Sequence, residues 1–379
     1  MSCIIKNFAN EMLPADVKKM IRQNSRRPDV KRLVIMPDVH LSHNVCVGTV
    51  TATSHLLYPN AIGSDIGCGM TAVKIGCSPG LLTAEAEKIL RLLSSAVPTI
   101  KHRSICSAPK ISKELLLEKL SNPKLNAALK KTARFSLSTL GRGNHFIEFQ
   151  KDQEGHSWLM IHSGSRSAGQ QISEFHRKKN NAGNKAVYHL ASESASGLDW
   201  LNDMNWAIKF ARLNRKQLVE MIDQNVLKFL GTTVDYDSLI DCCHDHILRE
   251  THNNEQLWVH RKGANRLYKG ETTIIAGSMG TKSYHVTGRN SELSLHSCSH
   301  GAGRQKSRFE ARKSMCPRLL LKEMHGVAFD NTNLNRLYDD APSAYKKIEN
   351  VLKAQKKVIK KVRTLTPLIS FKGTFGLSR

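Results

Sequence analysis

The sequence predicts an α+β fold, built as one large mixed domain over residues 1–379. Short apolar runs typical of strands are mixed with longer helical patterns, without the regular strand–helix alternation of a doubly wound parallel sheet. No internal repeat or low-complexity linker divides the 379 residues, a length that fits one large domain or two ordinary ones. Apolar residues make up 40% of the chain, which is enough for an extensive core.

The N-terminal part begins with a helix and a strand. Residues 15–25 have the apolar spacing of a short amphipathic helix. The run "VKRLVIMPDVH" that follows predicts a buried strand that ends at Pro37, because proline has no N–H to donate to a sheet. Helical patterns then cover residues 83–96 and 112–132.

Strands that run into glycine-rich turns characterise the rest of the chain. The segment "SWLMIHSGSR" has this pattern, and "EQLWVHRKGA" and "TTIIAGSMGT" repeat it. Between them, residues 168–179 and 197–230 are predicted to be helices. Because polar, glycine-rich clusters repeatedly follow short apolar strands, the sequence indicates a site assembled from many strand ends and loops.

A helix is also predicted near the C-terminus. Its apolar residues fall at helical spacing: Tyr345, Ile348, Leu352, Val358 and Val362. Lysines cover the other face: Lys346, Lys347, Lys353, Lys357, Lys360 and Lys361. We interpret this face as a solvated helix surface, with RNA contact as the alternative.

The charge points to a polyanionic partner. Lys and Arg total 57 against 32 acidic residues, a formal net charge of +25. Such a balance is most typical of nucleic-acid binding, and the alternative is an enzyme that merely happens to be basic. Aromatic residues make up only 6% of the chain, so base-stacking platforms of the single-strand-binding type are not expected.

The cysteines and the N-terminal segment predict a cytoplasmic protein. Nine cysteines, an odd number without a CxxC motif, do not indicate a disulfide framework in a chain of this length. The first residues lack a signal-peptide core, and no apolar run approaches the ~18 residues of a membrane span. We therefore expect a reducing compartment and no membrane partner.

The stretch "AIGSDIGCGM" places Asp65 and Cys68 three residues apart among glycines. One interpretation is a tight turn, with Asp65 bound to its own backbone and Cys68 buried as a small apolar residue. The other is a pair of metal ligands, which the surrounding glycines would allow to approach an ion closely. A thiolate that bridges two ions would explain why residue 68 is a cysteine and not a second aspartate.

Further candidate metal ligands lie beside predicted strand ends. The whole set is His40, Asp65, Cys68, His145, His162 and His244. Each histidine alone is more often a structural residue than a ligand, and spacing alone does not show that the set converges. The mixture of oxygen, sulfur and nitrogen donors suits a borderline metal such as Mn, Co or Zn better than Mg alone.

Two other segments suit phosphate chemistry. "AGSMGTKS", residues 276–283, offers backbone N–H groups, hydroxyls and Lys282 in a short turn, although it lacks the spacing of a P-loop. "CSHGAGR", residues 298–304, places His300 before small residues and an arginine. His300 could be a ligand, a general base, a nucleophile or simply a turn histidine.

Taken together, seven motifs make the chain resemble the RtcB family of RNA ligases. They are "PDVH", "GSDIGCGM", "GNHFIE", "HSGSR", "HRKGA", "GSMGTKS" and "SHGAGR", in the family's order, from about Pro37 to Arg304. A weaker similarity follows at "PLISFKG". The resemblance implies the family's own α+β arrangement around a deep central cleft for metal and nucleotide.

The resemblance implies a GTP-dependent and Mn²⁺-dependent ligase with two ions. It joins an RNA end carrying a 2′,3′-cyclic phosphate or 3′-phosphate to a 5′-hydroxyl end, in RNA repair or tRNA splicing. An accessory protein factor is a conceivable further partner. Carried onto this sequence, the family pattern makes His300 the nucleophile that takes GMP from GTP. It makes Cys68 the bridge between the ions, in a ligand set of Asp65, Cys68, His145, His162 and His244.

The resemblance also implies nucleotide contacts and, less directly, RNA contacts. Asn144 would contact the nucleotide phosphate, and Glu148 and Lys372 would read the guanine edge. The remaining nucleotide residues implied are Ser278, Gly280, Gly301 and Gly303. The basic residues of the motifs would hold the RNA backbone: Arg166, Arg261, Lys262 and Arg304.

Several departures from the family pattern indicate a divergent branch. "PDVH" is followed by "LSHNVCVG" where the family usually has a glycine-rich run, and Arg142 interrupts the glycines before Asn144. His244 is followed by Asp245 where an asparagine is usual, so a carboxylate replaces an amide that would contact the nucleotide. The chain is also short for the family. These differences concern substrate choice and the nucleotide pocket, and suggest a specialisation for the repair of one damaged RNA.

Two other functions compete with ligation. A metal-dependent phosphoesterase that only opens cyclic phosphates would need the metal ligands but not His300, so the presence of "SHGAGR" argues against it. A non-catalytic RNA-binding scaffold would have lost ligands, and all of them are present. The sequence therefore favours the ligase.

Overall fold

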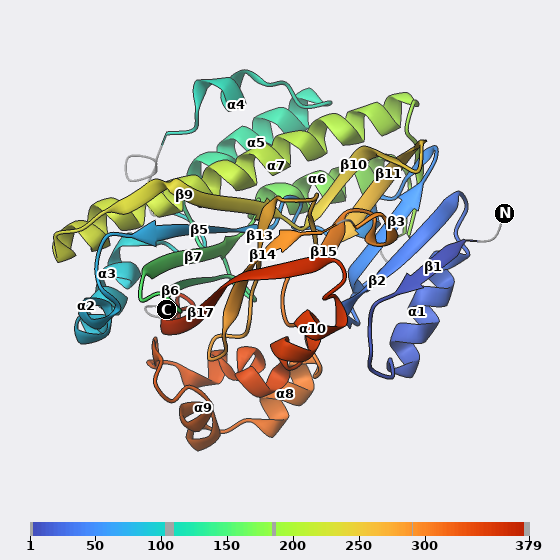
Figure 1. Ribbon diagram of the computed structural model, residues 1–379. Coiled ribbons are helices and arrows are strands. Elements are labelled where there is room, and N and C mark those ends of the chain that lie inside the picture. The colour runs from blue at the N-terminus through green and yellow to red at the C-terminus, as the bar shows by residue number, and fades with distance from the viewer. Residues whose placement is uncertain (1–2, 103–109, 184–186, 290, 375–379) are drawn as a thin grey trace.

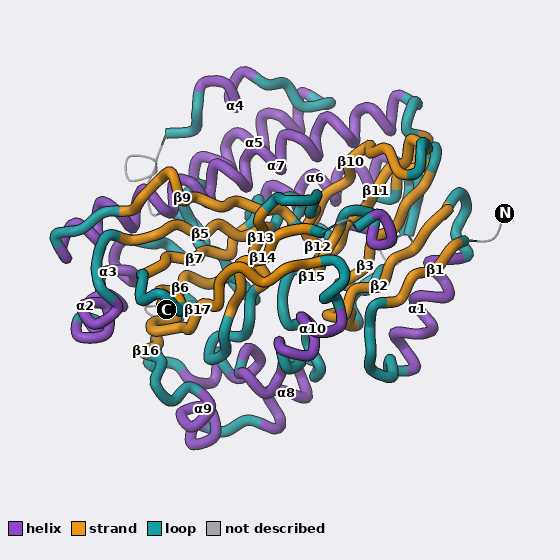
Figure 2. The backbone as a smooth tube through the Cα atoms, in the orientation of Figure 1, coloured by secondary structure: helices purple, strands orange, loops and turns teal. Residues whose placement is uncertain are grey.

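The computed structural model describes residues 3–102, 110–183, 187–289 and 291–374. The predicted α+β class is confirmed. Strands form the middle of the molecule, and helices cover it on either side, with α4 to α7 on one side and α8 to α10 on the other (Figure 2). The named strand pairs are antiparallel apart from β1–β2 and β16–β17.

The larger sheet has the strand order β13-β14-β17-β6-β7-β5-β9. Its edge strands β13 and β9 contact each other, so the sheet is nearly closed into a barrel. The short β16 (Ala328–Phe329) adds to β17. The bounds of the seven strands are β5 (Gly69–Ile75), β6 (Phe146–Asp152), β7 (Ser157–Ser163), β9 (Val234–Cys243), β13 (Thr272–Ile275), β14 (Ser283–Gly288) and β17 (Ile359–Phe371).

A second sheet has the order β1-β2-β3-β11-β10 and lies beside the first (Figure 1). Its strands are β1 (Ile4–Asn7), β2 (Val30–His40), β3 (Val47–Thr53), β10 (Asp245–His252) and β11 (Glu255–Lys262). Two small two-stranded sheets complete the set: β12 (Ala264–Arg266) with β15 (Ser297–Ser299), and β4 (Leu56–Leu57) with β8 (Leu190–Ala191). The chain passes from one large sheet to the other between β9 and β10, at His244.

The long helix α7 (Ala195–Ile222) packs on the larger sheet and helps to form two apolar cores. Its C-terminal residues Leu218 and Ile222 join a core made with β5, β6 and β7 and with α2 (Pro79–Ala84) and α3 (Ala86–Ala96). Its N-terminal half packs against α5 (Pro123–Ser136) and α6 (Ser167–Lys179). Ser194 accepts a hydrogen bond from the N–H of Gly197 and caps the helix. The predicted helices over 168–179 and 197–230 are therefore confirmed in their main parts.

Two predicted boundaries are wrong for reasons of backbone chemistry. The pattern over 112–132 is two helices, α4 (Lys113–Leu117) and α5, because Asn122 caps a new helix that begins at Pro123. Strand β2 does not end at Pro37 but continues to His40. Its pairing with β3 is interrupted between Ile35 and His40, so the missing N–H of Pro37 costs no ladder bond.

The predicted C-terminal helix is the largest error. Only α10 (Ile348–Ala354) is helical, and the chain then forms β17. Val362 and its neighbours Ile359, Thr364 and Thr366 are β-branched, which favours a strand. The strand also gains two partners, β6 and β14, which a helix could not pair with.

The remaining helices lie at the edges of the molecule. Helix α1 (Ala15–Ser25), as predicted, packs beside β2, and α8 (Arg308–Ser314) and α9 (Pro317–Glu323) form a separate group with α10 (Figure 1). None of the helices in the described ranges combines the length and the apolar character needed to cross a bilayer.

Candidate active site

Strand ends bring the predicted metal ligands together. In the larger sheet Gly69 pairs with Ser163 and with Cys243, and Phe146 pairs with His162. Because these neighbours are antiparallel, the first residues of β5 and β6 and the last residues of β7 and β9 lie at the same end of the strands. The predicted ligands are at these positions or within a few residues of them: Asp65, Cys68, His145, His162 and His244.

Backbone hydrogen bonds hold the two ligand-bearing turns against each other. The N–H of His244 donates to the carbonyl of Cys68 over 2.9 Å, and the N–H of Gly67 donates to the carbonyl of Asp245 over 2.8 Å. The segment before β5 is therefore tied to the crossing between the two sheets.

The glycines around Cys68 serve chain packing and not metal approach. A Cβ at Gly67 would lie 2.8 Å from the Cα of Ile208 on α7, and one at Gly69 would lie 2.1 Å from the carbonyl oxygen of Cys242. Room for a ligand comes from Gly164, where a Cβ would lie 2.4 Å from both carboxylate oxygens of Asp65. The interpretation of the glycines in "GSDIGCGM" as openings toward an ion is therefore wrong for Gly67 and Gly69.

The ligand atoms converge closely. Cys68 Sγ lies 3.4 Å from His145 Nε2 and 3.3 Å from His162 Nε2. His162 Nε2 also lies 3.4 Å from His244 Nε2, and His145 Nε2 lies 3.1 Å from a carboxylate oxygen of Asp65. All four imidazole and thiol residues are buried.

A hydrogen bond at Nδ1 of His162, the ring nitrogen that faces away from Cys68, fixes the tautomer of the ring. Its Nδ1 lies 3.1 Å from the carbonyl oxygen of Asn144, which can only accept, so Nδ1 carries the proton. The neutral ring then presents the lone pair of Nε2 to Cys68 and His244. The Nδ1 of His145 is likewise held by the carbonyl of Leu140, over 3.0 Å. Converging lone pairs of sulfur and nitrogen on oriented rings are what a borderline divalent cation requires. The residues therefore fit a metal site.

The ligands fall into two groups that share one residue. Cys68, His145 and His162 form one set whose donor atoms lie within 4.8 Å of one another, and Cys68, His244 and Asp245 form another. Asp245 follows His244 in the chain and lines the same pocket. A thiolate common to both sets is the arrangement expected of a bridge between two ions.

Burial sets the protonation of the ligands. It lowers the pKa values of His162 and His244 well below 6.5, so both rings are neutral and can ligate. Burial raises the pKa of the Cys68 thiol well above 9.0, and the charges of Asp65 and Asp245 raise it further. Cys68 can therefore bind as a thiolate only when a cation offsets the effects of burial and of the two carboxylates.

His300 lies in the same pocket and is held by an acid that the sequence reasoning did not assign. Its Nδ1 lies 2.7 Å from Oδ2 of Asp38, and the backbone N–H groups of His300 and Gly301 also donate to that oxygen, over 3.2 and 3.4 Å. Burial by itself lowers the pKa of His300, but the hydrogen bond to Asp38 and the charge of Asp38 raise it above 6.5. Asp38 fixes the ring and leaves Nε2 as its second nitrogen.

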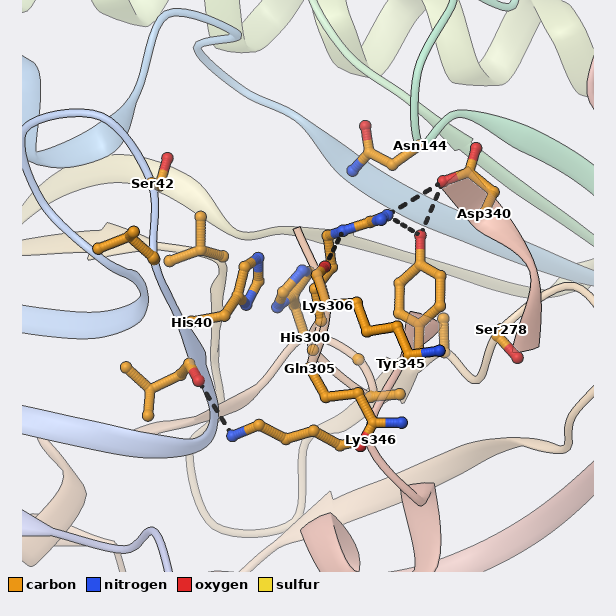
Figure 3. A pocket seen from close by; sticks show the side chains of 18 of the residues that line it. His40, Ser42, Asn144, Ser278, His300, Gln305, Lys306, Asp340, Tyr345 and Lys346 are labelled. Atoms are coloured by element: carbon orange, nitrogen blue, oxygen red, sulfur yellow. Dashed lines mark hydrogen bonds and ion pairs between the residues drawn. The ribbon is translucent and has the colours of Figure 1, made fainter. Parts of the chain in front are cut away.

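A pocket of about 940 Å³ is lined both by residues of the ligand cluster and by His300. Figure 3 shows the part of this pocket around His40, His300 and Tyr345. Its lining includes four of the five predicted ligands, Asp65, Cys68, His162 and His244, and five of the seven predicted nucleotide residues, Asn144, Ser278, Gly301, Gly303 and Lys372. His40 lies beside His300 in this pocket but belongs to neither ligand set, and its Nδ1 lies 2.9 Å from the carbonyl of Asp38.

The two other predicted nucleotide residues do not line the pocket. Glu148 is buried in β6, where Gln150 donates to one carboxylate oxygen over 3.3 Å and the other has no partner in the described part of the chain. Burial raises its pKa well above 4.5. Gly280 packs against a neighbouring segment, since a Cβ there would lie 2.9 Å from Pro342 Cγ.

Asp340 is a second residue that sequence reasoning missed. It lines the pocket, pairs with Lys372 over 2.6 Å and accepts a hydrogen bond from Tyr345 over 2.9 Å (Figure 3). Nothing in its local sequence marks it, because its cationic partners Arg304 and Lys372 lie far away in the chain. Asp38 did carry a signal: it is an acid at the end of a buried strand, two residues before the candidate ligand His40.

The prediction that Arg261 contacts RNA is wrong. Arg261 is fully buried, and its guanidinium donates to both oxygens of Glu250, over 2.6 and 2.9 Å. Of the other predicted RNA contacts, Arg166 approaches His145 Nδ1 to 3.0 Å outside the pocket lining. Lys262 and Arg304 do line the pocket. The ammonium group of Lys262 donates to backbone carbonyls, and Arg304 donates to backbone carbonyls and to the side chains of Asp340 and Tyr345.

Comparison with known proteins identifies the family of this chain. The family model described as tRNA-splicing ligase RtcB matches residues 20–373. RNA-splicing ligase RtcB1 of Escherichia coli is 30% identical over 95% of this chain and 94% of its own length. The tRNA-splicing ligase RtcB of Pyrobaculum aerophilum is 26% identical over 90% of this chain and 87% of its own. The matched region contains every predicted ligand and His300. The chain therefore belongs to the RtcB family of RNA ligases.

Proposed function

We propose that this chain joins RNA 2′,3′-cyclic phosphate or 3′-phosphate ends to 5′-hydroxyl ends, with GTP and Mn²⁺, in RNA repair or tRNA splicing. Residues 1–379 act as a single catalytic domain, in the cytoplasm. One observation carries the proposal: a single pocket brings the ligand sets that share Cys68 together with His300, whose Nδ1 is bound to Asp38.

His300 is the nucleophile in this proposal. With Nδ1–H donated to Asp38, the neutral ring has its lone pair on Nε2. Nε2 attacks the α-phosphorus of GTP, the bond to the β-phosphate oxygen breaks, and pyrophosphate leaves. The product is GMP joined to His300 by a P–N bond. Asp38 stabilises the positive charge that develops on the ring.

The later steps activate a poor electrophile. Water first opens a cyclic phosphate to a 3′-phosphate. An oxygen of that phosphate attacks the phosphorus of the guanylylated histidine, which frees His300 and places GMP on the RNA end. The 5′-hydroxyl then attacks the 3′-phosphate, a phosphodiester forms, and GMP leaves.

Asp65, Cys68, His145, His162 and His244 hold the metal in this proposal. When bound, Mn²⁺ supplies positive charge against the phosphates and Lewis-acid activation. The protein contributes the orientation: the carbonyl of Asn144 fixes the His162 ring, and Gly164 leaves space for the Asp65 carboxylate.

Glu148 and Lys372 recognise the guanine base in this proposal. Glu148 has an unpartnered oxygen within the described residues, and guanine offers two neighbouring N–H donors on one edge. Lys372 lies at the pocket wall, where Asp340 holds its ammonium group. A buried carboxyl oxygen without a donor is costly, so a base that supplies one gains specificity.

The test is a search for guanylylated protein. The chain is incubated with α-labelled GTP and Mn²⁺, and the label is then challenged with acid and with base. A phosphoramidate is labile in acid and stable in base, whereas a phosphoester is not acid-labile. Acid-labile label that is absent from His300→Ala supports the proposal, and absence of label from the metal-loaded wild type rejects it.

A further inference from the structure

The second ligand set assigns a role to Asp245. That set consists of Cys68, His244 and Asp245. His162 Nε2 lies 3.4 Å from His244 Nε2 and can serve the same ion, and Asp245 adds a carboxylate oxygen to these sulfur and nitrogen donors. Three protein ligands with remaining positions open to water or substrate are typical of catalytic metal sites. The other ion does not need Asp245, since Cys68 and His145 lie together with Asp65, whose carboxylate oxygen is 3.1 Å from His145 Nε2.

The local structure holds the Asp245 carboxylate in place without neutralising it. Oδ1 accepts a hydrogen bond from the N–H of Gly263 over 2.8 Å. Within the described ranges no lysine, arginine or histidine forms an ion pair with Asp245 within 4 Å. The nearby Lys262 donates its ammonium group to the carbonyls of His43 and Val45, over 2.9 and 2.7 Å.

A free carboxylate at this position would oppose the proposed function, on which this inference rests. It lines the pocket that receives the phosphates of GTP, and like charges repel strongly in a partly buried site. A cation bound by the carboxylate removes that conflict. We propose that Asp245 is a ligand of the second metal ion, together with Cys68 and His244. A carboxylate, a thiolate and an imidazole are a donor set suited to Mn²⁺ and to other borderline divalent ions.

Metal binding tests the assignment directly. Mn²⁺ is titrated into the full chain, wild type and Asp245→Asn, and binding is followed by calorimetry and by the electron paramagnetic resonance signal of Mn²⁺. The wild type is expected to bind two ions, with the signal altered by coupling through Cys68. Asp245→Asn keeps the Gly263 bond, and is expected to lose at least about tenfold in affinity for one ion and to show the signal of isolated Mn²⁺.

The control is Asp340→Asn, which removes the same charge from the same pocket. It is expected to bind both ions like the wild type. Equal loss in both variants would mean that Asp245 acts by charge alone, and unchanged binding in a folded Asp245→Asn would exclude ligation. If the wild type binds one ion but still takes GMP, Asp245 is not a ligand of a second ion. The proposed guanylyl transfer would not be contradicted by that result.

A separate observation concerns helix α1. Residues 11–14, which precede this helix, line the pocket, as do Asp16 and Val17 in its first turn and His40 and His43. One exposed face of α1 forms a shallow hollow of about 390 Å³, lined by Ala15, Lys18, Lys19, Arg22, Gln23 and Arg26. These positions recur three and four residues apart, so the four cations form one stripe that leads away from the pocket mouth.

The cations of this stripe have no acidic partners. In the described part of the chain, none of Lys18, Lys19, Arg22 and Arg26 makes an ion pair within 4 Å, whereas Arg304, Arg308 and Lys372 near the pocket all do. Unpaired cations beside the site of a protein with net charge +25 complement a polyanion. We infer that the α1 stripe binds the phosphate backbone of one RNA arm that enters the pocket.

The salt dependence of RNA binding tests this surface. Lys18→Gln/Lys19→Gln/Arg22→Gln is compared with Lys356→Gln/Lys357→Gln/Lys360→Gln, which removes three exposed lysines outside the pocket lining. Each lost phosphate contact lowers the slope of log affinity against log salt by about 0.7 to 0.9. The α1 variant is expected to lose about 2 in slope and the control less than 1, with GMP attachment unchanged in both.

If the α1 variant keeps the wild-type salt slope of RNA binding, this face does not contact RNA. It would then face solvent or bind an acidic protein. Equal losses in the two variants would show that net charge alone matters. Failure of the wild type to take GMP would instead concern the proposed function, so the two failures are distinguishable.

Discussion

His300 Nδ1 lies 2.7 Å from Oδ2 of Asp38, although the two residues are 262 positions apart in the chain. The same carboxylate oxygen accepts the backbone N–H of His300, so ring and backbone are held by one atom. This contact occupies Nδ1 and favours the tautomer with its lone pair on Nε2, which is the tautomer that the proposed nucleophile requires.

Asp38→Asn is expected to slow GMP attachment by roughly 10²- to 10⁴-fold, because an amide can no longer select the Nδ1–H tautomer. Metal content and the joining of RNA that already carries GMP on its 3′-phosphate should persist. The measurement is the rate of protein labelling from labelled GTP. The matched control is Asp16→Asn, at the rim of the same pocket, which should label normally. Equal slowing in both variants would remove the special role of Asp38.

His300→Ala is expected to abolish GMP attachment and the joining of 3′-phosphate to 5′-hydroxyl ends. It should keep near-normal metal content, because His300 belongs to neither ligand set. It should still join pre-guanylylated RNA, since that step does not use the imidazole. Failure of the folded, metal-loaded variant on that substrate would return His300 to a ligand or scaffold role.

Cys68→Ala is expected to lose both ions and both chemical steps, because Cys68 is the residue common to the two ligand sets. Metal content after dialysis, measured by elemental analysis, checks this. Cys46→Ala, at another buried cysteine, should retain the metal. Normal metal content in Cys68→Ala would exclude Cys68 from the site.

Arg261→Met is expected to destabilise the fold by about 3 to 5 kcal/mol, because it leaves Glu250 buried without its main partner. Burial alone raises the pKa of Glu250, but Arg261 and His252 lower it from 4.5 to about 2. This contribution to stability is therefore full above pH 4.5 and is lost as the pH falls toward 2.

Urea unfolding at several pH values measures the loss of unfolding free energy in Arg261→Met. This loss should become smaller at acidic pH. Arg266→Met removes a surface pair with Glu271 and should cost about 1 kcal/mol or less. A loss in Arg261→Met that is no greater than in Arg266→Met would contradict the buried-pair account, and a change in the salt slope of RNA binding alone would restore Arg261 as an RNA contact.

Local patterns predicted most helices and strands because periodicity reports which face a segment buries. They were wrong after the end of α10 at Ala354, where Val358 and Val362 fit helical spacing and strand propensity equally well. Pairing of β17 with β6 and β14 decided between them, and β6 and β14 lie far from β17 in the chain.

The sequence by itself determined the class of fold and the chemical identity of the site: a thiol, an acid and histidines beside strand ends, and His300 in a glycine-rich turn. Only the tertiary structure decided which of these side chains meet, since antiparallel register places the ends of β5, β6, β7 and β9 at one edge. It also decided that Arg261 is a buried partner of Glu250 and that Asp38 holds His300. The physical reason is that ligation and hydrogen bonding act over about 2 to 3.5 Å, a distance that sequence spacing does not specify for residues far apart in the chain.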